Sequence, residues 1–357
     1  MKLLCAISNH GLGHLAQTAP VLNAMGALHP GVEWLLWSGL PTSVLKERVR
    51  IDFAHRHEPA DMGLLMLDAL RVDRDGSQAA YLRFHDDWRG RVRREAAWMH
   101  QERVQGVLSN AAYLPLAAAA QAGIGSVGFC SLNWLDIARS YLHGLTGMEQ
   151  VFVDMDRSYQ SARSFLRLEP GMPMAWMSNL ESAEPVAATG QNRRLELEAN
   201  LGLREPRKLV LLGFGGVAYQ HALALPRLDG VAWLVPDAWP DRAREDMHTF
   251  RRSGLPFHDL LASCDTLLTK VGYGSFVEAA GLGIPVLYLD RPDWPETPWL
   301  ASWLHRHGRA AAIDEARLFS PSVQQELETL WRAPAPEPPD IAGAPAVARR
   351  IGKVLGL

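Results

Sequence analysis

The sequence predicts an α/β fold with two lobes, each built around a parallel sheet. Short apolar runs alternate with longer segments of helical periodicity along the chain, which is typical of βαβ units. The length of 357 residues exceeds one ordinary domain and suits two lobes of roughly 150 to 180 residues. A composition of 48% hydrophobic and 21% charged residues provides material for two cores.

Composition also excludes several classes of protein. A formal net charge of −3 gives no general attraction to nucleic acid or to an anionic membrane. The three cysteines, Cys5, Cys130 and Cys264, lie far apart without metal-ligand spacing, which favours reduced buried thiols. Residues 1–8 are too short an apolar run for a signal peptide, and no stretch is long enough to cross a bilayer. We therefore expect a cytoplasmic protein.

The first lobe is predicted to cover residues 1–180 as the acceptor-side, Rossmann-like domain. Its expected strands are residues 3–8, Glu33–Trp37, 49–53, 105–109, Ser126–Cys130 and 174–178. Residues 60–102 are mostly helical and charged. Their arginines favour a solvated helix face over a contact with an anionic acceptor.

A polar segment, residues 181–206, is predicted to link the two lobes. The second lobe then covers residues 207–332, with strands at 208–212, Val231–Val235, 266–269 and 285–289. Residues 333–357 combine a proline-rich connector with a C-terminal helix that can pack back on the first lobe.

A glycine-rich loop follows the first predicted strand and opens a helix. It reads Ser8-Asn9-His10-Gly11-Leu12-Gly13-His14-Leu15-Ala16. Glycines let the backbone approach a ligand, and the helix N-terminus beyond them carries partial positive charge. Gly11, Gly13 and Ala16 also fit the dinucleotide-binding spacing, but that fingerprint needs an acidic residue where this chain has Ser38-Gly39. A nicotinamide cofactor is therefore disfavoured.

Two histidines stand in this loop, His10 and His14. An unperturbed histidine pKa of about 6.5 suits a group that removes a proton from a hydroxyl. His14 lies where the helix begins, at the carboxyl ends of the strands, where open α/β sheets bind ligands. We favour a catalytic base there over a histidine that caps or packs under the loop. For His10, a functional role and a role in satisfying the turn are equally supported.

A second motif reads Thr269-Lys270-Val271-Gly272-Tyr273-Gly274-Ser275-Phe276-Val277-Glu278. A buried strand ends at Thr269, a glycine turn follows, and a helix is predicted to begin near Gly274 or Ser275. Such a turn presents backbone N–H groups to an anion, while Ser275 adds a hydroxyl and Lys270 a positive charge. A further turn, Gly213-Phe214-Gly215-Gly216, follows the first strand of the second lobe and can donate to the same anion.

Glu278 lies one helical turn beyond Ser275 on the same face. Its carboxylate can accept hydrogen bonds from the two vicinal hydroxyls of a ribose, so the motif can hold a nucleoside diphosphate. The alternative is structural, with Ser275 as N-cap and Glu278 as its capping-box partner. Lys270 and two glycines exceed what a cap requires, which favours the nucleotide site.

Taken together and in this order, the two motifs resemble those of the GT-B glycosyltransferases. The first is similar to the acceptor-side Gly-His loop of plant secondary-metabolite glucosyltransferases and of glycosyltransferase family 28, which implies that His14 is the catalytic base. The second resembles their donor signature, Thr-His-x-Gly-x-x-Ser-x-x-Glu, with Lys270 in place of the phosphate-contacting histidine. The Lys-x-Gly-Tyr-Gly variant and the loop at 291–300 resemble the N-terminal half of plant arabinokinases.

The resemblance implies two Rossmann-like, doubly wound lobes facing across a cleft, with the donor on the second lobe. This chain departs from the family at three points. Asn110 stands where an Asp commonly orients the base histidine, and Asp136 is the candidate substitute. The element that reads uracil is absent, so the donor's base stays open, with UDP favoured by the family alone. In the loop at 290–297, Glu296 is the candidate for the sugar hydroxyls.

The implied reaction is an inverting transfer of a sugar from a nucleotide-diphosphate sugar to an acceptor hydroxyl. The N–H groups of residues 272–275, Lys270 and the turn at 213–216 would stabilise the departing phosphate without a metal. Two other classes stay open: a nucleotide-sugar epimerase acting on the donor alone, and a non-catalytic nucleotide-sugar-binding module. The acceptor is not indicated; a lipid acceptor would imply peripheral membrane contact.

Overall fold

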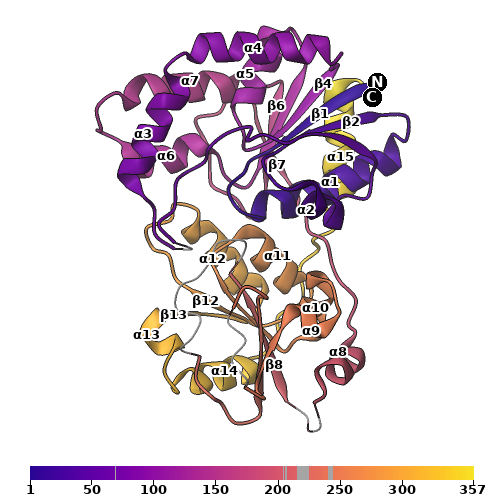
Figure 1. The fold of residues 1–357 in the computed structure, drawn as a ribbon, viewed down its shortest axis with the longest axis vertical. Helices are drawn as coiled ribbons and strands as arrows, with labels where there is room; N and C mark the ends of the chain where they lie inside the picture. The colour runs from indigo at the N-terminus through magenta and orange to yellow at the C-terminus, as the bar shows by residue number, and fades with distance from the viewer. Residues whose placement is uncertain (69, 204, 206, 215–224, 240–243) are drawn as a thin grey trace. The chain divides into compact units, whose positions relative to one another are not determined.

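The protein is described by a computed structural model of residues 1–357, in which all residues except 69, 204, 206, 215–224 and 240–243 are described. The chain forms two compact units. The first contains 1–67, 71–187 and 342–357, and the second contains 68–70 and 188–341. Each unit has its own parallel sheet, as the alternation of apolar runs and helical segments predicts (Figure 1).

The sheet of the first unit has seven strands within the described residues, in the order β3-β2-β1-β4-β5-β6-β7, and every pairing is parallel. The strands are β1 (Lys2–Ile7), β2 (Glu33–Trp37), β3 (Phe53–Arg56), β4 (Gly106–Asn110), β5 (Ser126–Cys130), β6 (Ser164–Leu168) and β7 (Leu180–Ala183). The central strands β1, β4 and β5 are buried almost throughout. Helices on both faces of a parallel sheet explain this continuous apolar character.

Helices connect the strands of the first sheet. They are α1 (Gly13–Leu28), α2 (Thr42–Arg48), α3 (Arg74–His85), α4 (Trp88–Gln101), α5 (Leu114–Gln121), α6 (Trp134–Leu142) and α7 (Met148–Gln160). The last helix of the chain, α15 (Ala344–Leu355), belongs to the same unit and lies beside α1 (Figure 1). Arg350 of α15 pairs with Glu181 of β7 at 2.8 Å, which ties this helix to the edge of the sheet.

The sheet of the second unit has six strands within the described residues, in the order β10-β9-β8-β11-β12-β13, also all parallel. They are β8 (Lys208–Gly213), β9 (Val231–Val235), β10 (Met247–Thr249), β11 (Thr266–Lys270), β12 (Val286–Leu289) and β13 (Ala310–Ile313). The described helices are α8 (Arg194–Leu201), α9 (Phe250–Ser253), α10 (Phe257–Ser263), α11 (Tyr273–Gly281), α12 (Thr297–His307), α13 (Glu315–Leu318) and α14 (Val323–Arg332).

Several predicted boundaries differ from the structure. Residues 174–178 are not a strand; the edge strand is β7, four residues of which only Ala183 is fully buried. The strand predicted at 49–53 begins only at Phe53, since α2 ends at Arg48 and residues 49–52 form no regular element. Residues 181–206, predicted as a linker, contain most of β7 and the whole of α8. β6, β10 and β13 were not predicted, because β6 and β10 mix polar and apolar residues and β13, Ala-Ala-Ala-Ile, is short and rich in alanine, which does not favour strands.

Candidate functional site

The glycine-rich loop of the first unit connects the end of β1 to the start of α1, as its sequence predicts. Gly11 adopts φ +74°, a left-handed conformation that favours glycine. His10 and Gly11 are half-buried and Gly13 is exposed at the first helical position, whereas His14 is buried at 5% exposure. The loop therefore places a buried imidazole at the carboxyl end of the first sheet.

His14 is oriented by Asn110, the last residue of β4. The Nδ1 atom of His14 lies 2.7 Å from Asn110 Oδ1, while Asn110 Nδ2 donates to Gln17 Oε1 at 3.2 Å. Gln17 Nε2 in turn donates to Ser131 Oγ at 2.8 Å. In this chain of bonds the Asn110 oxygen must accept, so Nδ1 of His14 carries the proton. The lone pair of the imidazole is then on Nε2, the atom that can act as a base.

The charge of His14 follows from its surroundings. Burial lowers the pKa of His14 to about 4, and the hydrogen bond to Asn110 only partly offsets this. His14 is therefore neutral at pH 7 and able to accept a proton. Because Asn110 is uncharged, it fixes the tautomer without stabilising the imidazolium as a carboxylate would.

Trp134 of α6 packs between the two histidines of the loop. Its ring centroid lies 4.9 Å from that of His10 in an edge-on arrangement and 5.6 Å from that of His14. The indole Nε1 donates to Ser8 Oγ at 3.0 Å, and Ser8 Oγ donates to Asp61 Oδ1 at 3.0 Å. These contacts hold the loop against α6 and against the segment that contains Asp61.

Asp61 is a buried carboxyl group that the sequence did not reveal. It is 1% exposed, its Oδ1 also accepts from the backbone N–H of Asn9 at 3.3 Å, and its Oδ2 has no hydrogen-bond partner among the described residues. Burial raises the pKa of Asp61 to about 6, although the hydrogen bonds from Ser8 and Asn9 oppose the shift. The ionised form of Asp61 therefore lowers the stability of the folded first unit.

We expect Asp61→Asn to stabilise the protein at alkaline pH. In the wild type, folding raises the pKa of this carboxyl group from 3.8 to about 6, so the folded state binds the proton more tightly than the unfolded state. The resulting contribution to stability is present below pH 4 and is lost as the pH rises through 6. The Asn variant keeps an oxygen for Ser8 and Asn9 and has no charge to bury. The difference in unfolding free energy should be near zero at pH 4 and about 2 kcal/mol in favour of the variant at pH 8.

Thermal or urea unfolding of both proteins between pH 4 and pH 8 measures this difference. The control is Asp86→Asn, which neutralises an exposed carboxylate of the same unit. An Asp61→Asn effect that is the same at both ends of the pH range would rule out the titration of Asp61 as its cause.

Asp136, the predicted support of His14, lies in the first turn of α6. Its carboxylate accepts from Asn133 Nδ2 at 2.7 Å and from Trp176 Nε1 at 2.9 Å, and its backbone N–H donates to the N-cap residue Asn133 at 2.8 Å. These bonds stabilise the start of α6. The polar partner of His14 is instead Asn110, and a catalytic role for Asp136 stays a prediction.

In the second unit, the predicted donor motif joins β11 to α11. β11 ends at Lys270, and Gly272 is the N-cap residue of α11, which begins at Tyr273. The helix thus starts one or two residues earlier than predicted, and Ser275 is not its N-cap. The capping-box alternative for Ser275 and Glu278 is therefore wrong. Gly272 has no side chain to cap the helix, so the amides of its first turn are suited to an anion.

Glu278 is buried on α11, 2% exposed, and contacts a residue that was not predicted. Its Oε1 lies 3.3 Å from Nε2 of His258 on α10. The carboxylate of Glu278 and the imidazole of His258 thus lie next to each other beside α11. A carboxylate and an imidazole next to each other can accept and donate hydrogen bonds to the hydroxyls of a sugar ring.

Lys270 stands near two charged residues of the loop that follows β12. β11 and β12 pair so that Lys270 is opposite Leu289, and Arg291 and Glu296 follow shortly after. Burial and the positive charge of Arg291 lower the pKa of Lys270 to about 8, while Glu296 raises it. Glu296 is buried and directly precedes α12, and its role toward the sugar hydroxyls stays a prediction.

The third part of the predicted donor site is the turn after β8. Gly213 ends this strand, and its carbonyl accepts from Thr269 Oγ1 at 2.7 Å, so it lies beside the end of β11. Gly215 and Gly216 lie outside the described residues. Gly213, Lys270, Gly272, Tyr273, Gly274 and Ser275 thus gather at the carboxyl edge of neighbouring strands, where ligands of open α/β sheets bind.

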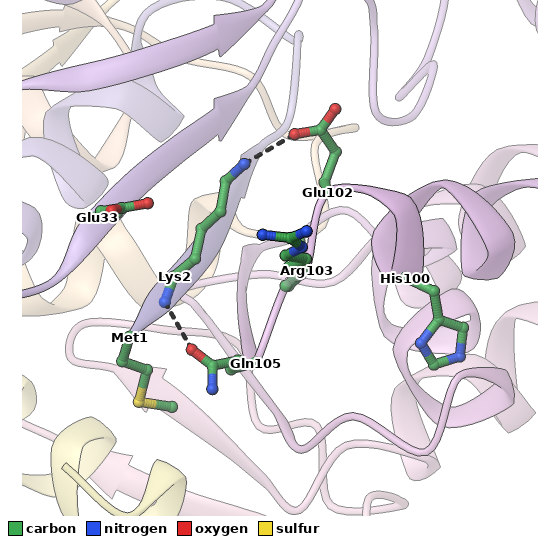
Figure 2. Close-up of a pocket in the computed structure, with 8 residues that line it drawn as sticks. Met1, Lys2, Glu33, His100, Glu102, Arg103 and Gln105 are labelled. Carbon is green, nitrogen blue, oxygen red and sulfur yellow. Dashed lines mark hydrogen bonds and ion pairs between the residues drawn. The ribbon is translucent and has the colours of Figure 1, made fainter.

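A separate hollow of about 510 Å³ lies at the amino ends of strands of the first sheet. It is lined by residues that include Lys2, Glu33 and Glu102 (Figure 2). Lys2 Nζ pairs with Glu102 at 2.7 Å, and the backbone N–H of Lys2 donates to Gln105. These residues are at the amino ends of β1 and β2, far along the strands from His14. We do not assign the donor or the acceptor to this hollow.

Two further findings concern the described residues only. They contain no group of three or more His, Cys, Asp or Glu side chains placed to hold a metal ion. Within the same ranges, no helix combines the length and the apolar character that a bilayer crossing requires.

Comparison with known proteins gives one curated relative by sequence. L-arabinokinase of Arabidopsis thaliana is 25% identical over 303 residues, which cover 84% of this chain and 29% of that protein. The chain thus spans less than a third of the relative it matches. No family model matches the sequence.

Solved structures match over nearly the whole chain. UGT2 of Phytolacca americana, complexed with UDP-2-fluoro-glucose and pterostilbene, has a TM-score of 0.59 at 13% identity and covers 99% of this chain and 94% of its own. The protein has the GT-B fold. Further glycosyltransferases match with similar scores. A UDP-N-acetylglucosamine 2-epimerase also matches, with a TM-score of 0.55 at 13% identity, covering 100% of this chain and 97% of its own.

Proposed function

We propose that this protein is an inverting, metal-independent glycosyltransferase that takes its sugar from a nucleotide-diphosphate sugar. The observation that carries the proposal is the placement of Lys270 at the end of β11, two residues before the glycine that is the N-cap of α11, with Glu278 buried on that helix. An ammonium group and open helix amides suit a diphosphate, and a carboxylate one turn further suits a ribose. The UDP ligand of the Phytolacca enzyme supports UDP as the first nucleotide to test.

The proposed chemistry uses one group from the first unit. Nε2 of His14 takes the proton of an acceptor hydroxyl as that oxygen attacks the anomeric carbon of the donor sugar. The bond from this carbon to the phosphate oxygen breaks, and the nucleoside diphosphate leaves with the electron pair. Lys270 and the first amides of α11 stabilise the negative charge on the leaving phosphate, a task that requires no metal ion.

The first experiment is a calorimetric panel of UDP, TDP, GDP and CDP sugars, with UDP as reference. Lys270→Met should weaken binding of the preferred compound by about 10-fold to 100-fold, because it removes one charge-assisted contact with phosphate. Lys353→Met, which removes an exposed lysine of α15, is the matched control and should leave binding unchanged. If no member of the panel binds the wild type, the proposed function is wrong.

A second candidate is a nucleotide-sugar epimerase, which the match to the UDP-N-acetylglucosamine 2-epimerase favours. An epimerase inverts a carbon of the donor sugar in the absence of an acceptor. Incubating the bound nucleotide sugar with enzyme alone and following the ring protons by NMR separates the two. A new sugar configuration supports the epimerase, whereas an unchanged donor that is consumed only with an acceptor supports the transferase.

A further inference from the structure

A single buried hydroxyl group joins two segments that lie against His14. Tyr159 of α7 is fully buried. Its hydroxyl donates to the carbonyl of Ala111 at 2.6 Å and accepts from the backbone N–H of Trp134 at 2.9 Å. Ala111 directly follows Asn110, whose amide oxygen lies 2.7 Å from Nδ1 of His14. The ring centroid of Trp134 lies 5.6 Å from that of His14.

The hydroxyl of Tyr159 satisfies two backbone groups with opposite requirements. A carbonyl only accepts and an N–H only donates, and one hydroxyl can serve both. Trp134 is the first residue of α6, where the backbone N–H has no acceptor within the helix. Burial raises the pKa of Tyr159 well above its ordinary value, so the hydroxyl keeps its proton for the carbonyl of Ala111. A phenylalanine at this position could serve neither group.

Ala111 has a strained backbone. Its φ of +59° lies in the left-handed region, which residues other than glycine rarely adopt. The N–H of Ala112 donates to the carbonyl of Asn110 at 2.8 Å and closes a tight turn around Ala111. Strain of this kind persists only where the surrounding structure imposes it, and it is concentrated at functional sites. The bond from Tyr159 to the carbonyl of Ala111 is one contact that imposes it.

The turn determines where the side chain of Asn110 lies. Asn110 ends β4 and is paired with Ile7 of β1, so the strand fixes the chain on one side of it. On the other side the chain passes directly into the turn at Ala111. The amide of Asn110 bonds to both His14 and Gln17, at 2.7 and 3.2 Å, and these distances leave little room for displacement. Relaxation of the turn would therefore change the contact that fixes the tautomer of His14.

We propose that Tyr159 is a positioning residue for His14, because its hydroxyl holds the turn at Ala111 in the strained conformation that keeps Asn110 against the imidazole. The inference rests on the proposed function, since it affects sugar transfer only if His14 is the base. Tyr159 acts through the turn and not on a substrate. Its place on α7, far along the chain from residues 110 and 14, explains why no local motif contains it.

Tyr159→Phe removes the hydroxyl and keeps the ring. The kcat of sugar transfer should fall about 10-fold, because a slightly displaced base no longer meets the acceptor hydroxyl in the productive geometry. The KM for the donor should not change, since Tyr159 belongs to the first unit and the proposed donor site to the second. Tyr81→Phe is the matched control and should keep the wild-type kcat. Tyr81 is equally buried, and its hydroxyl has no hydrogen-bond partner among the described residues.

The state of the His14 ring can be measured without any substrate. Nitrogen-15 NMR of the labelled protein distinguishes the two tautomers of a neutral histidine. In the wild type and in Tyr81→Phe, the proton of His14 should be on Nδ1, where Asn110 accepts it. In Tyr159→Phe the two nitrogens should approach averaged shifts, as the proton divides between them. A loss of stability that left Asn110 in place would not move these signals.

A glycine at position 111 should rescue the variant. Glycine adopts the left-handed conformation without strain, so the turn no longer depends on Tyr159 to hold it. The double variant Tyr159→Phe/Ala111→Gly should recover most of the lost kcat and the wild-type tautomer of His14, whereas Ala111→Gly alone should change neither. The double variant also keeps the test open if Tyr159→Phe does not fold, because the strain that Tyr159 opposes is absent from it.

The outcomes separate the inference from the proposed function. An unchanged His14 spectrum in Tyr159→Phe overturns the positioning role, even if transfer is slower. A double variant that does not fold, or that recovers neither kcat nor the tautomer, overturns the route through Ala111. A tautomer that shifts in Tyr159→Phe and returns in the double variant supports the inference, and it does so even if the wild type transfers no sugar, a result that would refute the proposed function alone.

Discussion

His14→Ala should reduce sugar transfer by about 10²-fold or more while leaving the affinity for the donor unchanged. The imidazole is neutral at pH 7 and its Nε2 holds the lone pair, since Nδ1 is engaged with Asn110. Removing it takes away the group that accepts the proton of the acceptor hydroxyl. Steady-state transfer assays give the loss in kcat, and calorimetry with the donor confirms that the second unit is intact.

The pH dependence of kcat/KM distinguishes a catalytic role of His14 from a purely structural one. A base whose pKa is about 4 is unprotonated throughout the neutral range, so kcat/KM should be flat above about pH 5 and fall below it. Asn110→Asp places a carboxylate beside Nδ1, which raises the pKa of His14 and should move this fall to higher pH. His100→Ala, which removes an exposed histidine of α4, is the control and should leave the profile unchanged. Full activity of His14→Ala would remove this histidine from the mechanism.

The overall fold could be predicted because its central strands are buried on both faces. β1, β5, β8 and β11 stand out as apolar runs even without partners, since parallel strands covered by helices need no polar side. β7 has the sequence Leu-Glu-Ser-Ala and β13 is nearly all alanine. Both are edge strands, formed because a neighbouring strand offers hydrogen bonds, which their own composition does not indicate.

The site could be predicted only where one local motif carries the chemistry. The loop at 8–16 and the motif at 269–278 each combine glycines with polar groups within a few residues. Asp61, His258 and Arg291 belong to the same two regions only through the tertiary structure. His258 faces Glu278 because α10 packs beside α11, and Arg291 lies near Lys270 because β11 pairs with β12. These contacts cannot be recognised from the spacing of residues in the sequence.

Glu278→Ala should weaken the binding of UDP by about 10-fold to 100-fold, the range for losing hydrogen bonds to a charged acceptor. The carboxylate is buried, and we expect it to accept from the two hydroxyls of the ribose. Pyrophosphate has no ribose, so its affinity should not change in this variant, in contrast to Lys270→Met. The two variants thus address the two halves of the donor separately.

A comparison of UDP with 2′-deoxy-UDP shows whether the lost contact is to the ribose. The wild type should prefer UDP, and Glu278→Ala should bind both alike, because the group that distinguishes them is absent. Glu278→Gln keeps one oxygen and the volume of the side chain, so it should retain part of the preference. Since Glu278 also lies 3.3 Å from His258, His258→Gln measures how far that imidazole positions the carboxylate. If Glu278→Ala folds and still distinguishes the two nucleotides as the wild type does, the ribose lies elsewhere and the donor cannot bind along α11 as proposed.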